Sequence, residues 1–176
     1  MKILLGVSGS ISAYRAVDIL RIFQKNDHQV TVVLTRAATR FITPLTFRTF
    51  VGNQVYLDMF ESESDPLPHI NLPRHHDLLL VAPATANLIG KFAGGIADDL
   101  LSSLYLACSQ PVVIAPAMNT RMLEHPAVSA NLQVLKERGV AVIETASGEL
   151  ACEETGKGRL APPQDIYEFC VKRLHV

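Results

Sequence analysis

Short runs of apolar residues alternate along the chain with longer segments in which apolar residues recur at helical spacing. The apolar run at residues 2–7 ends in a glycine and serine turn, and helical spacing follows over residues 11–23. Residues 29–35 are rich in valine and threonine, which favours a second strand. The beginning of the chain therefore predicts a strand, a helix and a second strand that lies parallel to the first.

The same alternation continues to the end of the chain. The further strands that we expect are residues 77–82, 111–115 and 140–143, with a short edge strand at 54–57. The further helices are residues 37–50, interrupted near Pro44, then 84–108, broken at Gly94 and Gly95, and finally 126–138 and 164–174. Residues 59–76 hold three prolines without clear periodicity, and they predict a long surface loop.

No internal repeat and no linker interrupts this pattern, so we expect residues 1–176 to form a single domain. Alternating strands and helices predict the α/β class. The expected architecture is a doubly wound parallel sheet, Rossmann-like or flavodoxin-like, with helices on both faces.

The composition excludes several classes of function. Sixteen Lys and Arg residues against seventeen Asp and Glu give a net charge of −1, which argues against a generic partner for nucleic acid or membrane surfaces. The hydrophobic share of 48% excludes disorder and favours an oligomer. No apolar stretch is long enough for a membrane span or a signal peptide, so we expect a cytoplasmic protein. Three widely spaced cysteines predict neither a disulfide framework nor a zinc module.

Three strand ends carry unusual residues, and ligands of such sheets bind beyond the carboxyl ends of the strands. Residues 6–10 (GVSGS) offer backbone N–H groups and serine hydroxyls to a phosphate, although a capped turn would explain Gly9 and Ser10 equally well. Residues 83–88 (PATANL) and 116–119 (PAMN) place small residues before Asn87 and Asn119. Each could be a plain helix cap, but two similar elements on successive strands favour a ligand site.

Histidines cluster at His69, His75 and His76 in the expected loop. They lack the i,i+4 spacing and the neighbouring Cys or carboxylate groups of a metal site, so we expect no metal.

Together these segments resemble the flavin-containing cysteine decarboxylase family. The matching stretches run in order from residue 6 to residue 160: GVSGSISAYR, TRAATRFI, DPLPHINL, LLLVAPATANLIGKFAGGIADDLL, PAMNTRM and SGELACEETGKGRL. The resemblance implies FMN-dependent conversion of 4′-phosphopantothenoylcysteine to 4′-phosphopantetheine in coenzyme A biosynthesis. It also implies FMN bound between the subunits of a homotrimer, or of a dodecamer built from trimers.

The resemblance assigns roles to individual residues. The flavin phosphate would lie near Gly9 and Ser10, and the other flavin-contacting positions would be Thr35, Phe41, Thr85, Ala86, Asn87 and Ala117. His69 would be the catalytic histidine, Asn119 would hold the substrate carboxylate, and Cys152 would donate a proton in the final reduction. FMN would oxidise the CH₂–SH group so that CO₂ can leave, and would then return hydride to the enethiol.

The chain departs from the family pattern at Leu88, where threonine is usual, and at Glu153 and Lys157, where glycine and proline are common. Glu153 places a carboxylate beside the expected proton donor.

Two other functions remain open from the sequence. A peptidyl-cysteine decarboxylase of lantibiotic maturation would stop at the enethiol and need no reducing acid, so Cys152 disfavours it. A non-catalytic, flavin-binding regulatory subunit would usually carry long acidic tails, and none is present in this sequence. The ligase domain often fused after such a decarboxylase is also missing, so we expect a separate phosphopantothenate–cysteine ligase to supply the small-molecule substrate.

Overall fold

A computed structural model describes residues 1–60, 65–149 and 155–174 of the chain. Its main sheet contains β1 (Lys2–Val7), β2 (Gln29–Leu34), β3 (Val55–Tyr56), β4 (Leu78–Ala84), β5 (Val112–Pro116) and β6 (Ala141–Val142). All neighbours pair in parallel, in the order β3-β2-β1-β4-β5-β6. This is the strand order of the Rossmann doubly wound fold, so the predicted architecture is confirmed.

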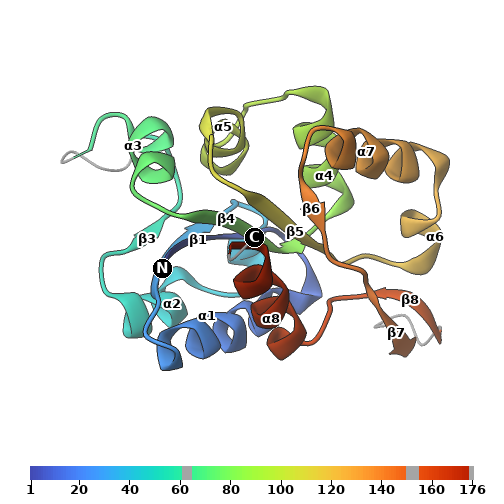
Figure 1. Ribbon diagram of the computed structural model, residues 1–176, viewed down its shortest axis with the longest axis horizontal. Coiled ribbons are helices and arrows are strands. Elements are labelled where there is room, and N and C mark those ends of the chain that lie inside the picture. The colour runs from blue at the N-terminus through green and yellow to red at the C-terminus, as the bar shows by residue number, and fades with distance from the viewer. Residues whose placement is uncertain (61–64, 150–154, 175–176) are drawn as a thin grey trace.

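Helices cover both faces of the sheet (Figure 1). One face carries α1 (Arg15–Lys25), α2 (Pro44–Val51) and α8 (Pro163–Leu174). The other carries α3 (Pro68–Arg74), α4 (Ala86–Gly94), α5 (Leu100–Ala107) and α7 (Pro126–Glu137). Because neither face of the sheet meets water, the strands are continuous apolar runs and not alternating ones.

Strand β1 shows how the two cores divide. Ile3, Leu5 and Val7 pack with α1 in one core, whereas Leu4 belongs to the other, beneath α4 and α5. Successive side chains of a strand point to opposite faces, so one apolar run supplies both cores.

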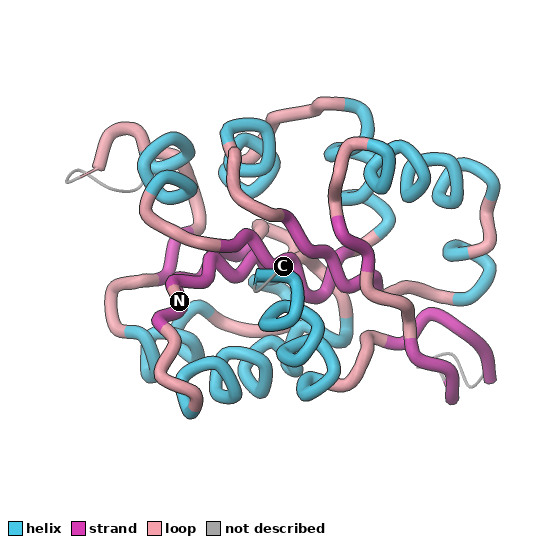
Figure 2. Tube along the Cα trace, viewed as in Figure 1, coloured by secondary structure: helices cyan, strands magenta, loops and turns pink. Residues whose placement is uncertain are grey.

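Five short elements complete the described chain. They are the 3₁₀ helices η1 (Ile11–Tyr14) and η2 (Ala38–Arg40), the helix α6 (Thr120–Leu123), and an antiparallel hairpin of β7 (Ala146–Glu149) and β8 (Thr155–Arg159). Figure 2 shows this hairpin beside the main sheet. The sequence analysis did not predict α6 or the hairpin, because glycine and polar residues in β7 and β8 hide the usual strand pattern.

The predicted long loop over residues 59–76 is wrong in its second half. There the chain forms α3, with Pro68 in its first turn and Pro73 inside it. Leu72 is only 7% exposed and packs in the core beneath α5. Tertiary burial therefore overrides the proline signal, which had favoured a loop.

The predicted helix over residues 37–50 also differs. Its first part is η2, and α2 begins at Pro44. Proline suits the first helical position because its missing N–H has no intrahelical partner there. Pro44 thus starts a helix where we expected an interruption.

Within the described ranges, no helix has the length and apolarity needed to cross a bilayer.

Burial predicts that two Leu→Ala substitutions differ strongly in their effect on the free energy of unfolding. Leu80→Ala removes a fully buried side chain from β4, so we expect it to lower the free energy of unfolding by about 2–5 kcal/mol. Leu45→Ala changes a residue that is 68% exposed, and should alter that free energy by less than about 0.5 kcal/mol. Urea unfolding at one protein concentration measures both. Equal effects would contradict the described core.

Candidate functional site

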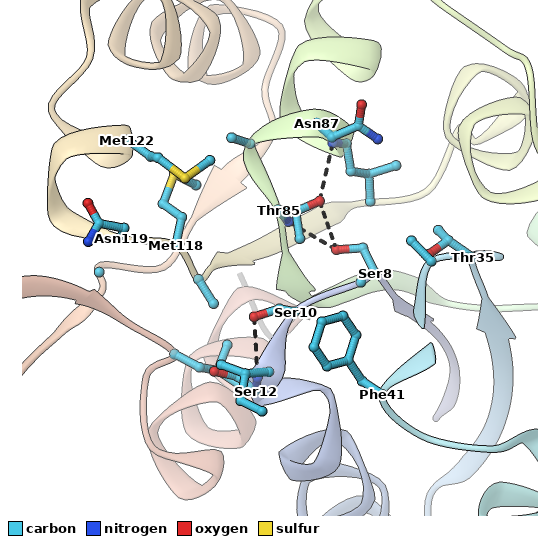
Figure 3. A pocket seen from close by; sticks show the side chains of 18 of the residues that line it. Ser8, Ser10, Ser12, Thr35, Phe41, Thr85, Asn87, Met118, Asn119 and Met122 are labelled. Carbon is cyan, nitrogen blue, oxygen red and sulfur yellow. Dashed lines mark hydrogen bonds between the residues drawn. The ribbon is translucent and has the colours of Figure 1, made fainter. Parts of the chain in front are cut away.

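The carboxyl ends of β1, β4 and β5 open into a cavity of about 840 Å³. Small-molecule sites usually measure about 300–1,000 Å³. The sequence-predicted residues that line it are Gly9, Ser10, Thr35, Phe41, Thr85, Ala86, Asn87, Ala117 and Asn119. In Figure 3, Asn119, Met118 and Met122 lie on one side of the cavity, and Thr35 and Phe41 lie on the other. The predicted strand ends therefore meet in one place.

Ser8 joins two of these strand ends, a role that the sequence analysis missed. Its hydroxyl donates to the Pro83 carbonyl over 2.7 Å and accepts the Thr85 N–H over 3.0 Å. The Thr85 hydroxyl lies 3.2 Å from the same oxygen (Figure 3). Ser8 is 2% exposed, so these bonds form away from bulk water. They fix the turn after β1 against the start of α4.

The sequence left two roles open for residues at the strand ends, a helix cap and a ligand contact, and at Ser10 and Thr85 these roles are compatible. Ser10 caps η1 by accepting the Ser12 N–H over 3.2 Å, and Thr85 caps α4 by accepting the Leu88 N–H over 3.4 Å. Both residues also line the cavity. Asn87, in contrast, is no cap, because it is the second residue of α4 and exposed. Its amide is thereby available to the cavity that it lines.

Gly9 permits a close approach of two loops. A Cβ at this position would lie 2.5 Å from the Cβ of Ala37 and 2.9 Å from its carbonyl carbon. The Thr35 N–H also donates to the Val7 carbonyl over 3.0 Å. The absence of a side chain at Gly9 thus brings the segment of Thr35 and Phe41 against the cavity.

Asn119 has a defined amide orientation. Its Oδ1 accepts the Arg121 N–H over 2.8 Å and caps α6. The Nδ2 group is the donor end of this amide, and an anion requires donors. The capping role and the predicted carboxylate role therefore use opposite ends of one amide.

The hairpin docks directly onto this segment. The Thr120 hydroxyl donates to the Lys157 carbonyl over 2.6 Å, and the Met118 N–H donates to the Gly158 carbonyl over 2.9 Å. A Cβ on Gly158 would lie 2.2 Å from the Met118 carbonyl oxygen, so only glycine allows this approach. Cys152 and Glu153 belong to the connection between β7 and β8, which lies outside the described residues.

His69 does not join the other predicted residues. It occupies the first turn of α3, not a loop, and it is not among the residues that line the cavity. Its Nδ1 is buried and has no hydrogen-bond partner among the described residues. A buried polar atom without a partner carries a free-energy cost, which commonly marks a functional group.

Basic side chains dominate the charges of the cavity wall. Among the described residues, the wall contains four basic side chains, of Arg15, Arg36, Lys91 and Arg159, and one carboxylate, that of Asp99. The Lys91 ammonium lies 2.7 Å from Asp98 and 2.9 Å from Asp99. Burial opposes charge on this ammonium, but its hydrogen bonds to both carboxylates raise the pKa of Lys91 above its ordinary value. The two carboxylates thus compensate the positive charge of Lys91. The positive charges of the three arginines make the cavity suited to an anion.

The chain is similar to known proteins over nearly its whole length. Residues 1–175 match a protein-family model described as Flavoprotein. The coenzyme A biosynthesis bifunctional protein CoaBC of Bacillus subtilis (strain 168) is 44% identical over 98% of this chain and 43% of that protein. The chain thus spans less than half the length of this curated relative.

Two solved structures are similar over their whole length. A cysteine-to-serine mutant of a PPC decarboxylase, complexed with pantothenoylaminoethenethiol, has a TM-score of 0.88 and 31% identity, and the match covers 99% of this chain and 98% of that chain. The FMN-dependent cysteine decarboxylase SpaF has a TM-score of 0.86 and 29% identity, and the match covers 100% of this chain and 98% of that chain.

The packing at Gly9 predicts opposite effects for two Gly→Ala substitutions. Gly9→Ala forces a Cβ into the backbone of Ala37, so we expect a loss of about 1–3 kcal/mol in the free energy of unfolding. Gly90→Ala in α4 meets only Asn131 at 3.6 Å and should gain about 0.5–1 kcal/mol from helix propensity. Denaturant titration compares the two variants with the wild type. A neutral Gly9→Ala would contradict the close approach.

Proposed function

The chain belongs to the Flavoprotein family, and we propose that it is an FMN-dependent decarboxylase that converts 4′-phosphopantothenoylcysteine to 4′-phosphopantetheine in coenzyme A biosynthesis. One observation carries the proposal. Every residue that the sequence resemblance assigns to the flavin, together with Asn119, lines one cavity. The near-complete match to a PPC decarboxylase supports the same reaction, and the similarity to CoaBC supports the same biosynthesis.

The cavity fits FMN in size and in chemistry. The Ser10 N–H donates to the Ser8 carbonyl, but the hydroxyls of Ser10 and Ser12 line the cavity and suit the phosphate. Small residues at Ala86 and Ala117 leave room for a flat ring. When bound, FMN supplies a two-electron acceptor that can take hydride from the substrate and return it. Gly9, Ser10, Thr35, Phe41, Thr85, Ala86, Asn87 and Ala117 are the residues that would hold it.

Asn119 would orient the substrate carboxylate through its Nδ2 group. Loss of CO₂ removes the negative charge from that carboxylate, so a strong cationic partner would stabilise the ground state more than the transition state. A neutral amide donor orients the group without that cost. The capped Oδ1 keeps the donor end pointing in one direction.

His69 and Cys152 would handle protons and the carboxylate. The buried Nδ1 of His69 lacks a partner within the described ranges, which supports a role for the imidazole as base or carboxylate partner. We assign to Cys152 the proton donation that accompanies the final reduction, because a thiol is a far stronger acid than a serine hydroxyl.

Assembly forms part of the proposal. His69 is not among the residues that line the cavity of its own chain. Four large apolar side chains line that cavity with exposures of 59%, 55%, 51% and 49%: Ile11, Tyr14, Phe41 and Met122. Large apolar side chains that remain half-exposed are typical of interfaces. We propose a homotrimer, alone or assembled into a dodecamer, in which His69 of one subunit completes the cavity of the next.

The setting of the enzyme belongs to the same proposal. We place it in the cytoplasm, where a phosphopantothenate–cysteine ligase would supply its substrate. Peptidyl-cysteine decarboxylation is the second candidate, because SpaF is a cysteine decarboxylase of the same fold.

The product separates these activities. We expect the purified protein to be yellow, to release FMN on denaturation, and to convert 4′-phosphopantothenoylcysteine to a product lighter by one CO₂. Cys152→Ser should still decarboxylate but accumulate the enethiol, two hydrogens lighter than 4′-phosphopantetheine. Mass spectrometry of the products measures both results. A wild type that ends at the enethiol would favour the peptidyl-cysteine reading, and a protein that cannot bind FMN would refute the proposal.

Mixed oligomers test the shared cavity. Asn119→Asp keeps the helix cap but repels a carboxylate, so we expect it to lower kcat/KM by about a hundredfold. His69→Asn should be similarly inactive. If each site takes Asn119 from one subunit and His69 from the next, oligomers co-expressed from both variants in equal amounts should recover roughly a quarter of wild-type sites. Turnover of the purified mixed species is the measurement. No recovery would show that one chain supplies both residues.

A further inference from the structure

Helix α3 carries His69, but its own backbone does little to fix its position. It is seven residues long, and Pro73 inside it has no N–H to donate. Helices of this length are not stable alone in water. Contacts outside the helix therefore determine where the imidazole of His69 lies.

Asp65 provides the contact at the beginning of α3. Its Oδ1 accepts the Leu67 N–H over 3.1 Å and the side-chain amide of Asn71 over 2.8 Å. This carboxylate thereby joins the residue before the helix to its middle.

His76 provides the contact at the other end. Its Nδ1 lies 2.5 Å from the Leu72 carbonyl oxygen, and its Nε2 lies 2.8 Å from the hydroxyl of Thr31. A carbonyl can only accept, so Nδ1 carries a proton. The Thr31 hydroxyl lies between Nε2 and the Oε1 of Gln54, to which it donates over 3.1 Å. Thr31 is 5% exposed and lies in β2, between β1 and β3 in the sheet. The ring thus ties the last turn of α3 to a rigid strand.

The surroundings of this ring favour its neutral form. Burial lowers the pKa of His76, the Leu72 hydrogen bond and Asp77 act in the opposite direction, and Lys2 and His75 lower it further. His28 is another titratable group on a second cavity, of about 500 Å³, which Thr31 and His76 also line. The net effect is a pKa of His76 below its ordinary value.

The two histidines are close along the helix. Leu72, whose carbonyl His76 holds, comes three residues after His69, which is one helical turn. A movement of that carbonyl therefore also moves the turn that carries His69. Small displacements of a reacting group strongly affect the rate, because the geometry of attack is narrow.

We propose that His76 is the positioning residue for His69, and that it acts through the bridge from Leu72 to Thr31. This inference rests on the proposed catalytic role of His69. The sequence analysis grouped His75 with His76, but the imidazole of His75 is exposed and takes no part in the bridge from Leu72 to Thr31, so it is the matched control.

Substitutions at both ends of the bridge test the proposal in the FMN-loaded protein. His76→Leu removes both hydrogen bonds of the bridge. Thr31→Val removes the one to His76, together with the bond from Thr31 to Gln54, with little change in shape. We expect each to lower kcat about tenfold while KM and FMN affinity stay unchanged. The double variant should be no worse than His76→Leu alone, because the two act through one bridge. His76→Gln, which can form both bonds, should restore most of the activity, and His75→Asn should behave as wild type.

A readout without substrate separates this inference from the proposed function. The ¹⁵N imidazole signals of His69, assigned with His69→Asn, should shift in His76→Leu and Thr31→Val but not in His75→Asn. If the wild type fails to turn over substrate, the proposed function falls while this measurement still reports on the bridge. Unchanged His69 signals together with unchanged kcat would overturn the positioning role. A loss of FMN affinity equal to the loss of kcat would also overturn the positioning role, because the substitution would then disturb the whole protein and not the position of His69 in particular.

Discussion

The hydrogen bonds of Ser8 hold together the two strand ends on which the site depends. In the strand order of this sheet, β1 lies between β2 and β4. The helix that follows β1, α1, covers one face of the sheet, and the helices that follow β4, α4 and α5, cover the other. The carboxyl ends of β1 and β4 therefore diverge into a crevice, where ligands of such sheets bind. Ser8 bridges that crevice at its base through Pro83 and Thr85. The turn after β1 and the start of α4 thus act as one wall, to which β5 and the hairpin add the other.

Much of this arrangement could be predicted from the sequence, because the signals were local. Parallel strands buried on both faces must be apolar runs, and GVSGS, PATANL and PAMN follow three of them directly. The sequence analysis could not find the features that depend on distant partners. Helix α3 exists because Leu72 packs beneath α5, and its prolines argued for a loop. The hairpin exists because Gly158 lies on the backbone of Met118, and glycine normally weakens a strand.

The three neighbouring histidines also differ in ways that the sequence alone cannot predict. His69, His75 and His76 lie within eight positions, and composition treats them alike. Their surroundings differ completely: one has a buried ring nitrogen without a partner in the described chain, one is exposed, and one bridges a helix to a strand. No periodicity distinguishes them, because the distinction comes from Thr31 in β2, far away in the sequence.

The cap formed by Asn119 has a consequence for the entropy of binding. A free asparagine amide must be oriented when a ligand arrives, and immobilising such a side chain costs about 0.5–1.5 kcal/mol. Here the Arg121 N–H has already set the orientation as part of folding α6. The ordering cost is thus included in the stability of the protein. If Asn119 binds the substrate carboxylate as proposed, capping and recognition share one side chain, and the ligand gains affinity without any additional contact.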